Sequence, residues 1–343
     1  MIRTAFLFGG RGAEHEVSLM SAASVLAHLP KSCYPIPIYI TKGGEWQHYP
    51  FEGLSIVKNA LHSKHIPQAV SLPLGGESAL WAGGESLGAD VIFPLLHGAE
   101  GEDGRVAGLL DVAGIPYVGC GTAAGAMGMN KALAKAYLSH FGIPVVPWHR
   151  VFASEPLTKE RLALIEGEIP YPIFVKPTAG GSSLGASCAR DREGLIAAIH
   201  AAAKYSDAVL CESCVHGREI EVAVLQTDAF TVSRPGEIVS DGFYDYEAKY
   251  LSQKTKLLIP APIPAALAER ARRLAARIFH LLGCRHLARV DFFAVDNDLY
   301  FNEINTMPGF TEASMYPRLL EDAGYPLPQL INALVESAHA GSL

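Results

Sequence analysis

The segment 286–305, HLARVDFFAVDNDLYFNEIN, holds the densest set of polar side chains that could do chemistry. Two apolar-rich runs flank a short acidic turn, which predicts a β-hairpin. Alternate residues of a strand share a face, so Arg289 and Asp291 point the same way on the first strand. Glu303 and Asn305 do so on the second. The pattern therefore predicts one polar face on an otherwise apolar hairpin.

A metal site is the first interpretation of this face. A three-residue turn would pair Val295 with Leu299, and the ladder would then place Asp291 directly opposite Glu303. Like charges in opposite positions destabilise a ladder unless a cation lies between them. Carboxylate and amide oxygens favour a hard ion such as Mg²⁺, which shares its shell with substrate phosphates. The pattern thus indicates a nucleotide site, and the alternative is the solvated face of an edge hairpin.

A loop of small residues follows the apolar strand in 173–185, IFVKPTAGGSSLG. The strand ends in Lys176, and the backbone N–H groups of such a loop can approach phosphate oxygens closely. The loop is not a Walker A motif, because Ala186 follows Gly185 where that motif needs lysine. A phosphate loop and an ordinary surface turn are the two interpretations, and the lysine at the strand end favours the first.

A second glycine-rich turn, GGRGAEH at 9–15, follows the first predicted strand. A dinucleotide fingerprint would need glycine where His15 stands and an acid at the end of the second strand, where 39–41 reads YIT. The strand–glycine–helix context still favours an anion or zwitterion site at the helix N-terminus. Glu14 would then contact an ammonium group.

Two further polar clusters are HGAEGEDG at 97–104 and YDYEAKY at 244–250. His97 stands at the end of a predicted strand, where open α/β sheets bind ligands. The alternative is a structural histidine. The second cluster lies within an irregular stretch, 233–259, of the kind that forms functional loops.

The six cysteines do not make a disulfide scaffold in a chain of 343 residues. Cys211 and Cys214 form a C-x-x-C pair, but no second pair at matching spacing accompanies it, as a structural zinc site would need. We therefore expect all six to be reduced, buried thiols.

Helices and strands must hold these residues in place. Over the first 120 residues, short apolar runs alternate with helical patterns. This alternation predicts βαβ units around a parallel sheet. The predicted strands are 4–8, 34–40, 91–96, 143–147, 172–176, 208–211 and 219–226, and the predicted helices are 16–29, 126–141 and 192–205. A further helix, the strongest of the patterns, begins at Pro264 and ends at Gly283.

The composition excludes several classes of protein. The net charge of −7 and the 49% of hydrophobic residues suit a chain with a sizeable core and two or three domains. A pI near 6.0 gives no basic footprint for nucleic acid. The N-terminal apolar run is too short for a signal peptide, and no stretch reaches the ~18 apolar residues that span a bilayer. We expect a cytoplasmic protein that binds neither nucleic acid nor membrane.

Together, the phosphate loop after a strand lysine, the late Arg-x-Asp and the Glu-x-Asn strand resemble the ATP-grasp carboxylate–amine ligases. Within them the chain is similar to the D-alanine–D-alanine ligases over nearly all its length, through GGRGAEHEVS, LLHGAEGEDG, MGMNK, FVKPTAGGSSLG, YDYEAKY, ARVDFF and NEINTMPGFTEASMYP. The resemblance implies a mixed α/β, three-domain ATP-grasp fold. We expect a Rossmann-like parallel-sheet domain at 1–121, a central ATP-grasp lid domain at 122–211, and a C-terminal ATP-grasp domain with the metal and acceptor site at 212–343.

The resemblance also implies how ATP and metal bind. Lys131 and Lys176 match phosphate-binding lysines, Glu212 and Glu219 match the acids that bind the adenine amino group and the ribose, and Lys249 matches the mobile-loop lysine that closes on the γ-phosphate. Asp291, Glu303 and Asn305 match the ligands of two Mg²⁺ ions, which Mn²⁺ can replace. Ser213 and Cys214 depart from the pattern, because many relatives carry bulkier residues there, beside adenine.

For the amino acids, the resemblance implies a second set of residues. Glu14 matches the residue that holds the ammonium group of the first D-alanine, in a hydrogen-bonded triad with Ser182 and Tyr250, and His97 lies near the same substrate. The groups that face the tetrahedral oxyanion and the second carboxylate match Arg289, the backbone N–H of Gly309, Ser314 and Met315.

The implied activity is ATP-dependent synthesis of D-alanyl-D-alanine for peptidoglycan through an acyl phosphate, by a homodimer. The nearest alternative is a resistance-type ligase that makes D-Ala-D-Ser or D-Ala-D-lactate. A third is a dinucleotide-dependent oxidoreductase or nucleotide-sensing module built on the N-terminal sheet, which the failed fingerprint disfavours.

Overall fold

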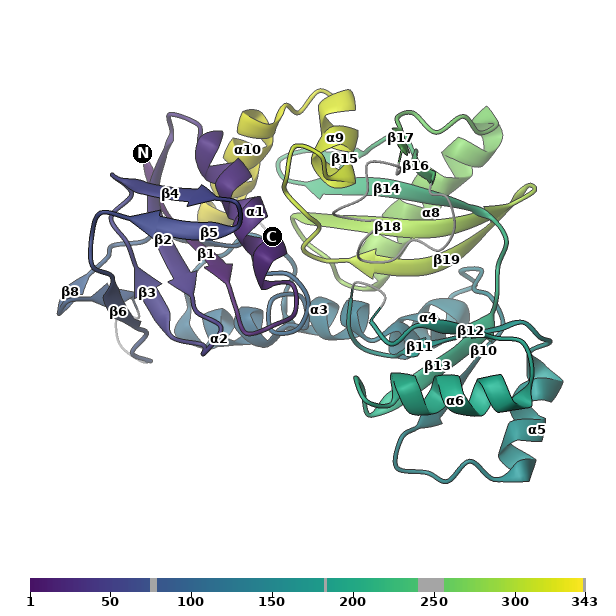
Figure 1. The fold of residues 1–343 in the computed structure, drawn as a ribbon. Coiled ribbons are helices and arrows are strands. Elements are labelled where there is room, and N and C mark those ends of the chain that lie inside the picture. Colours follow the sequence, from purple (N-terminus) through teal and green to yellow (C-terminus); the bar gives the residue numbers. More distant parts are fainter. Residues whose placement is uncertain (75–78, 182–183, 240–255, 342–343) are drawn as a thin grey trace.

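The computed structural model describes residues 1–74, 79–181, 184–239 and 256–341. It has the expected mixed α/β fold, in which three main sheets follow one another along the chain, each with its own helices (Figure 1). None of the helices in these four ranges is long and apolar enough to cross a bilayer.

The first sheet is parallel at its centre, where β1 pairs with β2 and β9. The core of β1 is buried on both faces, as is typical of a parallel strand covered by helices. Antiparallel strands, which the βαβ pattern did not predict, extend one side of the sheet. The order is β8-β7-β6-β3-β2-β1-β9. The elements of this part are β1 (Ile2–Gly9), α1 (His15–Ala27), β2 (Cys33–Ile40), β3 (Trp46–His48), the hairpin β4 (Leu54–Val57) and β5 (Ala60–Ser63), β6 (Gln68–Ser71), β7 (Trp81–Ala82), β8 (Glu85–Ser86), β9 (Val91–Pro94) and α2 (Arg105–Ala113).

The second sheet is antiparallel, with the order β10-β13-β11-β12. Its surroundings correct two predictions. The expected helix at 126–141 is two helices, because Asn130 leaves the helical conformation and its side chain accepts a hydrogen bond from the Leu133 N–H to cap the second one. The expected strand at 143–147 is reduced to one bridge between Val145 and Phe301. The elements are α3 (Thr122–Met129), α4 (Lys131–His140), β10 (Trp148–Phe152), α5 (Lys159–Glu168), β11 (Ile173–Pro177), β12 (Ser187–Ala189), α6 (Arg192–Ala202) and β13 (Ala208–Ser213).

The third sheet has the order β17-β16-β14-β18-β19, with β15 on β14. The predicted helix after Pro264 is confirmed as α8, which buries Leu267, Ala271 and Ile278 and ends before Gly283, whose φ of 66° suits glycine. The elements are β14 (Arg218–Gln226), β15 (Phe230–Val232), β16 (Gly236–Val239), β17 (Lys256–Leu258), α8 (Ala265–Leu281), β18 (Leu287–Val295), β19 (Asp298–Asn305), α9 (Met315–Asp322) and α10 (Leu327–His339).

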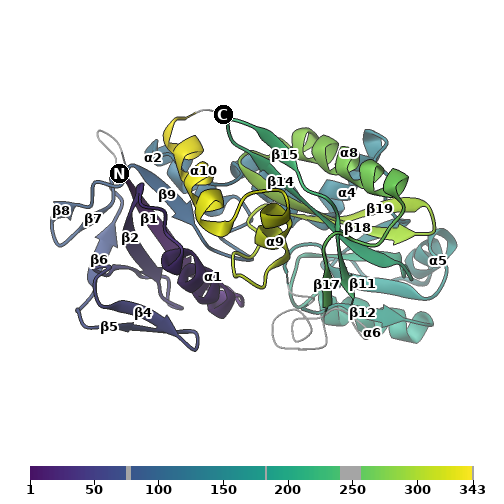
Figure 2. The same cartoon turned by 90° about the horizontal axis from the view of Figure 1, so that it is seen from above.

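The C-terminal helix joins the first part of the chain to the last. Leu330, Leu334 and Val335 of α10 share one buried cluster with Phe6 and Phe93 of the first sheet. Both ribbon views place α10 beside α1 (Figures 1 and 2). The two ends of the chain therefore pack into a common core.

Because His286 is buried, we expect the free energy of unfolding to depend on pH. The imidazole is 3% exposed and its Nδ1 accepts a hydrogen bond from the Gly119 N–H across 3.1 Å. Burial lowers the pKa of His286 from 6.5 to about 4. The unfolded chain takes up the proton first, so this stability is complete above pH 6.5 and is lost as the pH falls toward 4, by roughly 3 kcal/mol.

The measurement is the free energy of unfolding in urea from pH 7.5 to 4, for the wild type and for His286→Gln. Carboxylates contribute equally to both curves, so their difference isolates the imidazole. We expect the wild-type curve to fall more steeply below pH 6.5. Parallel curves would show that the imidazole is not held neutral by the fold.

Candidate active site

The polar hairpin forms as predicted, but through a different turn. The turn between β18 and β19 has two residues rather than three, so Val295 pairs with Asp298. A bulge at Asn302 then adds one residue to β19, and the ladder beyond it pairs Asp291 with Glu303. The predicted opposition of the two carboxylates is therefore confirmed, whereas the predicted turn is wrong.

Arg289 neutralises one side of this carboxylate pair. Its Nε and one terminal nitrogen donate to Asp291 across 2.8 and 2.7 Å, and Nε lies 2.9 Å from Glu221 Oε2. Burial alone would lower the pKa of Arg289, but the charges of Asp291 and Glu221 hold it well above its usual range. Asn305 Nδ2 also donates to Asp291, across 2.9 Å. A guanidinium is thus fixed with one face toward the site.

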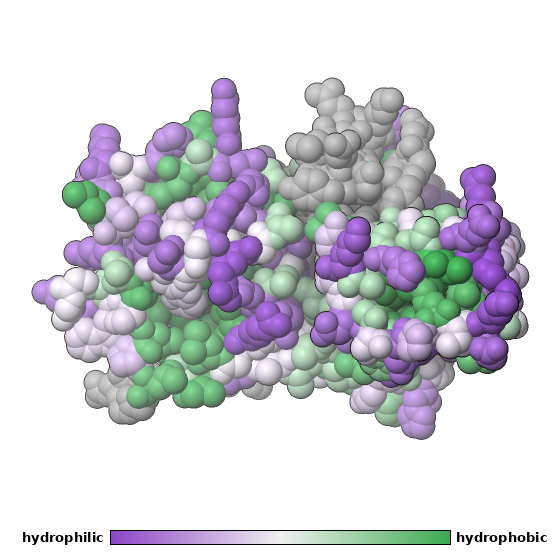
Figure 3. All heavy atoms as spheres, turned by 60° about the horizontal axis from the view of Figure 1, so that its bottom comes forward, coloured by the Kyte–Doolittle hydropathy of each residue, from purple (hydrophilic) through white to green (hydrophobic). Residues whose placement is uncertain are grey.

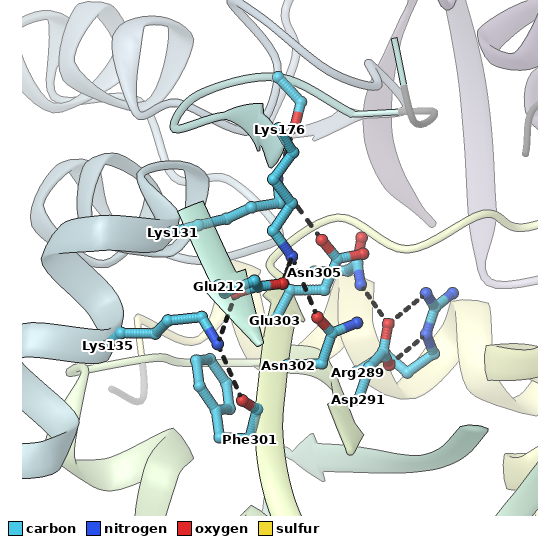
Figure 4. Close-up of polar contacts among 11 residues, drawn as sticks. Lys131, Lys135, Lys176, Glu212, Arg289, Asp291, Phe301, Asn302, Glu303 and Asn305 are labelled. Atoms are coloured by element: carbon cyan, nitrogen blue, oxygen red, sulfur yellow. Dashed lines mark hydrogen bonds and ion pairs between the residues drawn. The ribbon is translucent and has the colours of Figure 1, made fainter. Parts of the chain in front are cut away.

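A second charge cluster joins the central sheet to α4. Lys176 Nζ lies 2.5 Å from one oxygen of Glu212, and Lys135 Nζ lies 3.2 Å from the other (Figure 4). Lys135 is fully buried and also donates to the Phe301 carbonyl across 3.3 Å. Burial lowers the pKa of Lys135, and burial would raise that of Glu212, but the two lysines lower it instead. Glu212 is therefore held as a carboxylate inside the protein.

Lys135 was not among the residues predicted from the sequence. The only signal for it is the spacing of four residues from Lys131, which places both lysines on one face of α4. Glu221 was missed as well, because it alternates with Glu219 on β14 and looks like an ordinary strand residue.

Lys131 connects the glycine–serine loop to the hairpin. Its Nζ donates to the Gly180 carbonyl across 2.7 Å and lies 3.5 Å from Glu303 Oε2. Lys176 Nζ reaches the bulge residue Asn302 across 3.4 Å. Figure 4 shows Lys131 directed toward Glu303 of β19, and Lys176 directed toward Asn302 of β19 and Glu212 of β13. Both predicted phosphate lysines, the loop and the predicted metal ligands thus meet in one place.

Glu14 lies directly before α1 and is 9% exposed. Its carboxylate lies against the backbone of two distant glycines, since a Cβ on Gly98 or Gly181 would stand 2.3 or 2.9 Å from Glu14 Oε2. Gly181 precedes Ser182 in the glycine–serine loop. The carboxylate predicted to hold an ammonium group therefore lies beside the loop that carries its predicted partner.

His97 connects α1 to the loop after β19. Its Nδ1 lies 3.0 Å from the Met307 carbonyl, and its Nε2 lies 2.8 Å from Ser21 Oγ. Because a carbonyl only accepts, Nδ1 carries the proton and Nε2 accepts from the Ser21 hydroxyl. Ser21 Oγ in turn accepts from the Phe310 N–H across 3.3 Å. These bonds fix the loop that contains Gly309, and the position of His97 near the first substrate stays a prediction.

Most of the residues predicted to contact the amino acids line one cavity. Ser314 stands at the N-terminus of α9, where unpaired N–H groups favour a carboxylate. Among the residues that line the cavity are Glu14, His97, Arg289, Asn305, Gly309, Ser314 and Met315.

Two family models match the chain. The model described as D-ala D-ala ligase N-terminus matches residues 3–120, and the one described as D-ala D-ala ligase C-terminus matches residues 137–336. The chain belongs to the D-alanine–D-alanine ligase family.

Individual members of the family are similar to this chain over nearly their full length. The chain is 44% identical to the D-alanine–D-alanine ligase of Caldicellulosiruptor bescii, covering 98% of this chain and 95% of the relative. Among solved structures it resembles the VanG D-Ala:D-Ser ligase from Enterococcus faecalis, with a TM-score of 0.85, 34% identity, and coverage of 98% and 99% of the two chains. It also resembles the D-alanine-D-alanine ligase from Coxiella burnetii, with a TM-score of 0.84, 29% identity, and coverage of 99% and 94%.

The donor set of this D-alanine–D-alanine ligase family member suits a hard divalent cation. Asp291, Glu303 and Asn305 offer only oxygen ligands, and the two carboxylates occupy opposed positions of one ladder. No group of three His, Cys, Asp or Glu that could hold a metal occurs in the four described ranges. The Asn305 amide oxygen and ligand oxygens would therefore have to complete the shell.

Three predicted residues of the ligase, Ser182, Lys249 and Tyr250, lie outside the described residues. Glu219 lies on β14, paired with Phe293 of β18 and Ile238 of β16. Their predicted roles remain predictions.

Proposed function

We propose that this protein joins two D-alanine molecules into D-alanyl-D-alanine for peptidoglycan synthesis, with conversion of ATP to ADP and phosphate. Family membership supports ligation and removes the dinucleotide-dependent oxidoreductase as an alternative. One arrangement carries the proposal: Lys131 contacts Glu303 of the opposed carboxylate pair, Lys176 contacts the neighbouring Asn302, and Arg289 of the same hairpin lines the cavity with Glu14 and Ser314.

The first step activates a poor acyl donor. A carboxylate does not react with an amine, so the carboxylate of the first D-alanine takes the γ-phosphoryl group of ATP and becomes an acyl phosphate. Both reactants are anionic, and Lys131 and Lys176 hold the phosphates against their mutual repulsion. Asp291, Glu303 and Asn305 would hold Mg²⁺, which would supply positive charge next to the phosphates. Glu212 accepts a hydrogen bond from the adenine amino group.

The second step forms the peptide bond. Glu14 holds the ammonium group of the first D-alanine, and the N-terminus of α9 at Ser314 holds the carboxylate of the second. The amine of the second D-alanine attacks the acyl carbon, and Arg289 with the Gly309 N–H stabilises the tetrahedral oxyanion. Phosphate then leaves. Water must be kept from the acyl phosphate, which it would otherwise hydrolyse.

The alternative function, a resistance-type ligase, differs in the acceptor that is joined to D-alanine. The similarity to the VanG D-Ala:D-Ser ligase, at 34% identity, favours D-serine as the second candidate acceptor, with D-lactate as the third. The test is ADP release with ATP, Mg²⁺ and D-alanine, repeated with D-serine and D-lactate as competitors, with products identified by mass. D-alanyl-D-alanine as the dominant product supports the proposal. Mixed products would move the protein to the resistance class, and no ADP release would contradict ligation.

The position of the Glu14 carboxylate gives a prediction for Gly181→Ala. The new methyl group would stand 2.9 Å from Glu14 Oε2 and push the carboxylate from its place. We expect the KM for the first D-alanine to rise about tenfold, equivalent to ~1.4 kcal/mol of lost binding, with the KM for ATP little changed. Gly167→Ala is the matched control, because a Cβ there meets no atom within 4 Å. An unchanged KM for D-alanine would argue against the ammonium role of Glu14.

We also propose that the protein is a homodimer. Apolar side chains gather on the N-terminal lobe, at the left of the face in Figure 3, and such patches mark interfaces. Helix α2 leaves Leu109 and Val112 exposed. Light scattering after gel filtration should give twice the chain mass of 36.7 kDa. A mass of one chain at micromolar concentration would contradict the dimer.

A further inference from the structure

Two of the six cysteines contradict the expectation that all are buried. Cys188 is exposed and Cys214 is half-buried, whereas Cys33, Cys120, Cys211 and Cys284 are buried. The sulfur atoms of Cys188 and Cys214 lie 3.7 Å apart. The chain therefore has an accessible pair of thiols in contact, formed by residues 26 positions apart.

This thiol pair lies on the nucleotide side of the central sheet. Cys188 on β12 and Glu212 on β13 both pair with Phe174 of β11, so the three side chains share one face. The opposite face, with Val175 and Cys211, packs into the core cluster under the helices. Cys214 follows Glu212 by two residues, so its side chain returns to the side of Glu212 and Lys176.

We propose that Cys188 and Cys214 form a reversible disulfide with oxidants of the peroxide class, and that this bond weakens ATP binding. The effect on ATP rests on the proposed function, whereas the bond itself does not. Cys214 lies two residues after Glu212, the carboxylate proposed to accept a hydrogen bond from the adenine amino group. Closing the pair therefore changes the wall of the pocket at the base.

The chemistry balances with hydrogen peroxide as the oxidant. The exposed Cys188 thiol loses its proton, and the thiolate attacks one peroxide oxygen, which breaks the O–O bond and gives a sulfenic acid and hydroxide. The hydroxide takes up the released proton and becomes water. The Cys214 sulfur then attacks the sulfenic sulfur, the S–S bond forms, and a second water leaves with the Cys214 proton. The two thiols lose two electrons, which reduce the peroxide to two waters. Burial raises the pKa of Cys214 to about 11, which favours Cys188 as the first nucleophile.

The geometry allows closure at modest cost. A disulfide has an S–S length near 2.05 Å, so sulfurs 3.7 Å apart must approach by about 1.7 Å. Strand β12 has three residues and lies at the edge of the sheet, where β11 is its one partner among the described strands. An edge strand this short can shift toward Cys214. The shift occurs on the face that carries Phe174 and Glu212, which is where the nucleotide is proposed to bind.

The buried cysteines provide an internal contrast. Cys120 and Cys284 are also neighbours, and a hydrogen bond between their side chains raises the pKa of Cys284. Both lie inside the cluster beneath α8 and are 8% and 7% exposed. Peroxide cannot reach them while the chain is folded, so they should remain reduced.

The experiment treats the full-length protein with hydrogen peroxide and removes the excess with catalase. Free thiols, disulfide-linked peptides by mass, and the KM for ATP and kcat are then measured. We expect the six thiols to fall to four, a peptide pair that links Cys188 to Cys214, and a KM for ATP raised about fivefold or more. Dithiothreitol should restore all three. Cys188→Ser should keep its reduced-state activity and resist peroxide, whereas the control Cys33→Ala should respond as the wild type does.

The outcomes separate the two parts of the account. Six remaining thiols, or a linkage that involves another cysteine, would overturn the disulfide. A linked pair with an unchanged KM for ATP would overturn its effect on binding. Failure of the reduced protein to release ADP with D-alanine would contradict the proposed function alone, since thiol counts and peptide masses do not depend on activity.

Discussion

Glu303→Gln is expected to reduce ligase turnover by about 10³-fold, which corresponds to roughly 4 kcal/mol of lost transition-state stabilisation. The substitution keeps the shape of the side chain and removes the charge that faces Asp291 across the ladder. The proposed metal site would keep one carboxylate instead of two. Lys131 would lose the ion pair in which its Nζ lies 3.5 Å from Glu303 Oε2. Turnover is measured as ADP release with saturating ATP, D-alanine and Mg²⁺.

The fold should survive this change. The Glu303 side chain is 28% exposed and its ion pair with Lys131 is long, so the pair contributes at most about 1 kcal/mol. Circular dichroism and urea unfolding should match the wild type. Asp298→Asn is the control, because it removes an acid from the same strand where the side chain is 65% exposed. A folded Glu303→Gln protein with wild-type turnover would exclude the proposed role.

Lys135→Met should have the largest effect on stability. The variant leaves Glu212 buried with one lysine instead of two and deprives the Phe301 carbonyl of its donor. Breaking a buried ion pair from one side typically costs 3–5 kcal/mol, and Lys176 remains to limit the loss to about 3 kcal/mol. The measurement is the free energy of unfolding in urea, with Lys159→Met, which removes an exposed lysine, as the control.

A double variant tests whether the unpaired buried charge causes the loss of stability. Lys135→Met with Glu212→Gln removes both buried charges, so part of the lost free energy of unfolding should return. The KM for ATP should be higher than that of the wild type, because the carboxylate proposed to bind adenine is gone. If Lys135→Met alone unfolds at the same urea concentration as the wild type, the buried cluster does not hold this part of the structure together.

The alternation of strand residues was enough to predict the central pair of the site. Asp291 and Glu303 were expected to face each other, and they do. The route to that result was wrong, because the bulge at Asn302 has no signature in a single sequence. Bulges depend on how a strand packs against its partner, and Asn302 reads as one more polar residue of a strand.

Contacts between residues that are far apart in the chain could not be predicted from the sequence. Lys135 is buried because α4 packs on β19, and nothing in the helical pattern of α4 shows that partner. The bonds from Ser21 through His97 to the Met307 carbonyl connect three segments that are far apart in the chain. The exposure of Cys188 depends on β12 being an edge strand, which only the sheet order reveals.

Isotope transfer from D-alanine to phosphate shows whether the reaction passes through an acyl phosphate. D-alanine labelled with ¹⁸O in both carboxylate oxygens is incubated with the protein, ATP and Mg²⁺, and the released phosphate is analysed by mass. We predict one ¹⁸O in each phosphate and one in each peptide carbonyl, because the bridging oxygen of the acyl phosphate leaves with phosphorus. Phosphate without ¹⁸O, released together with dipeptide, would contradict it.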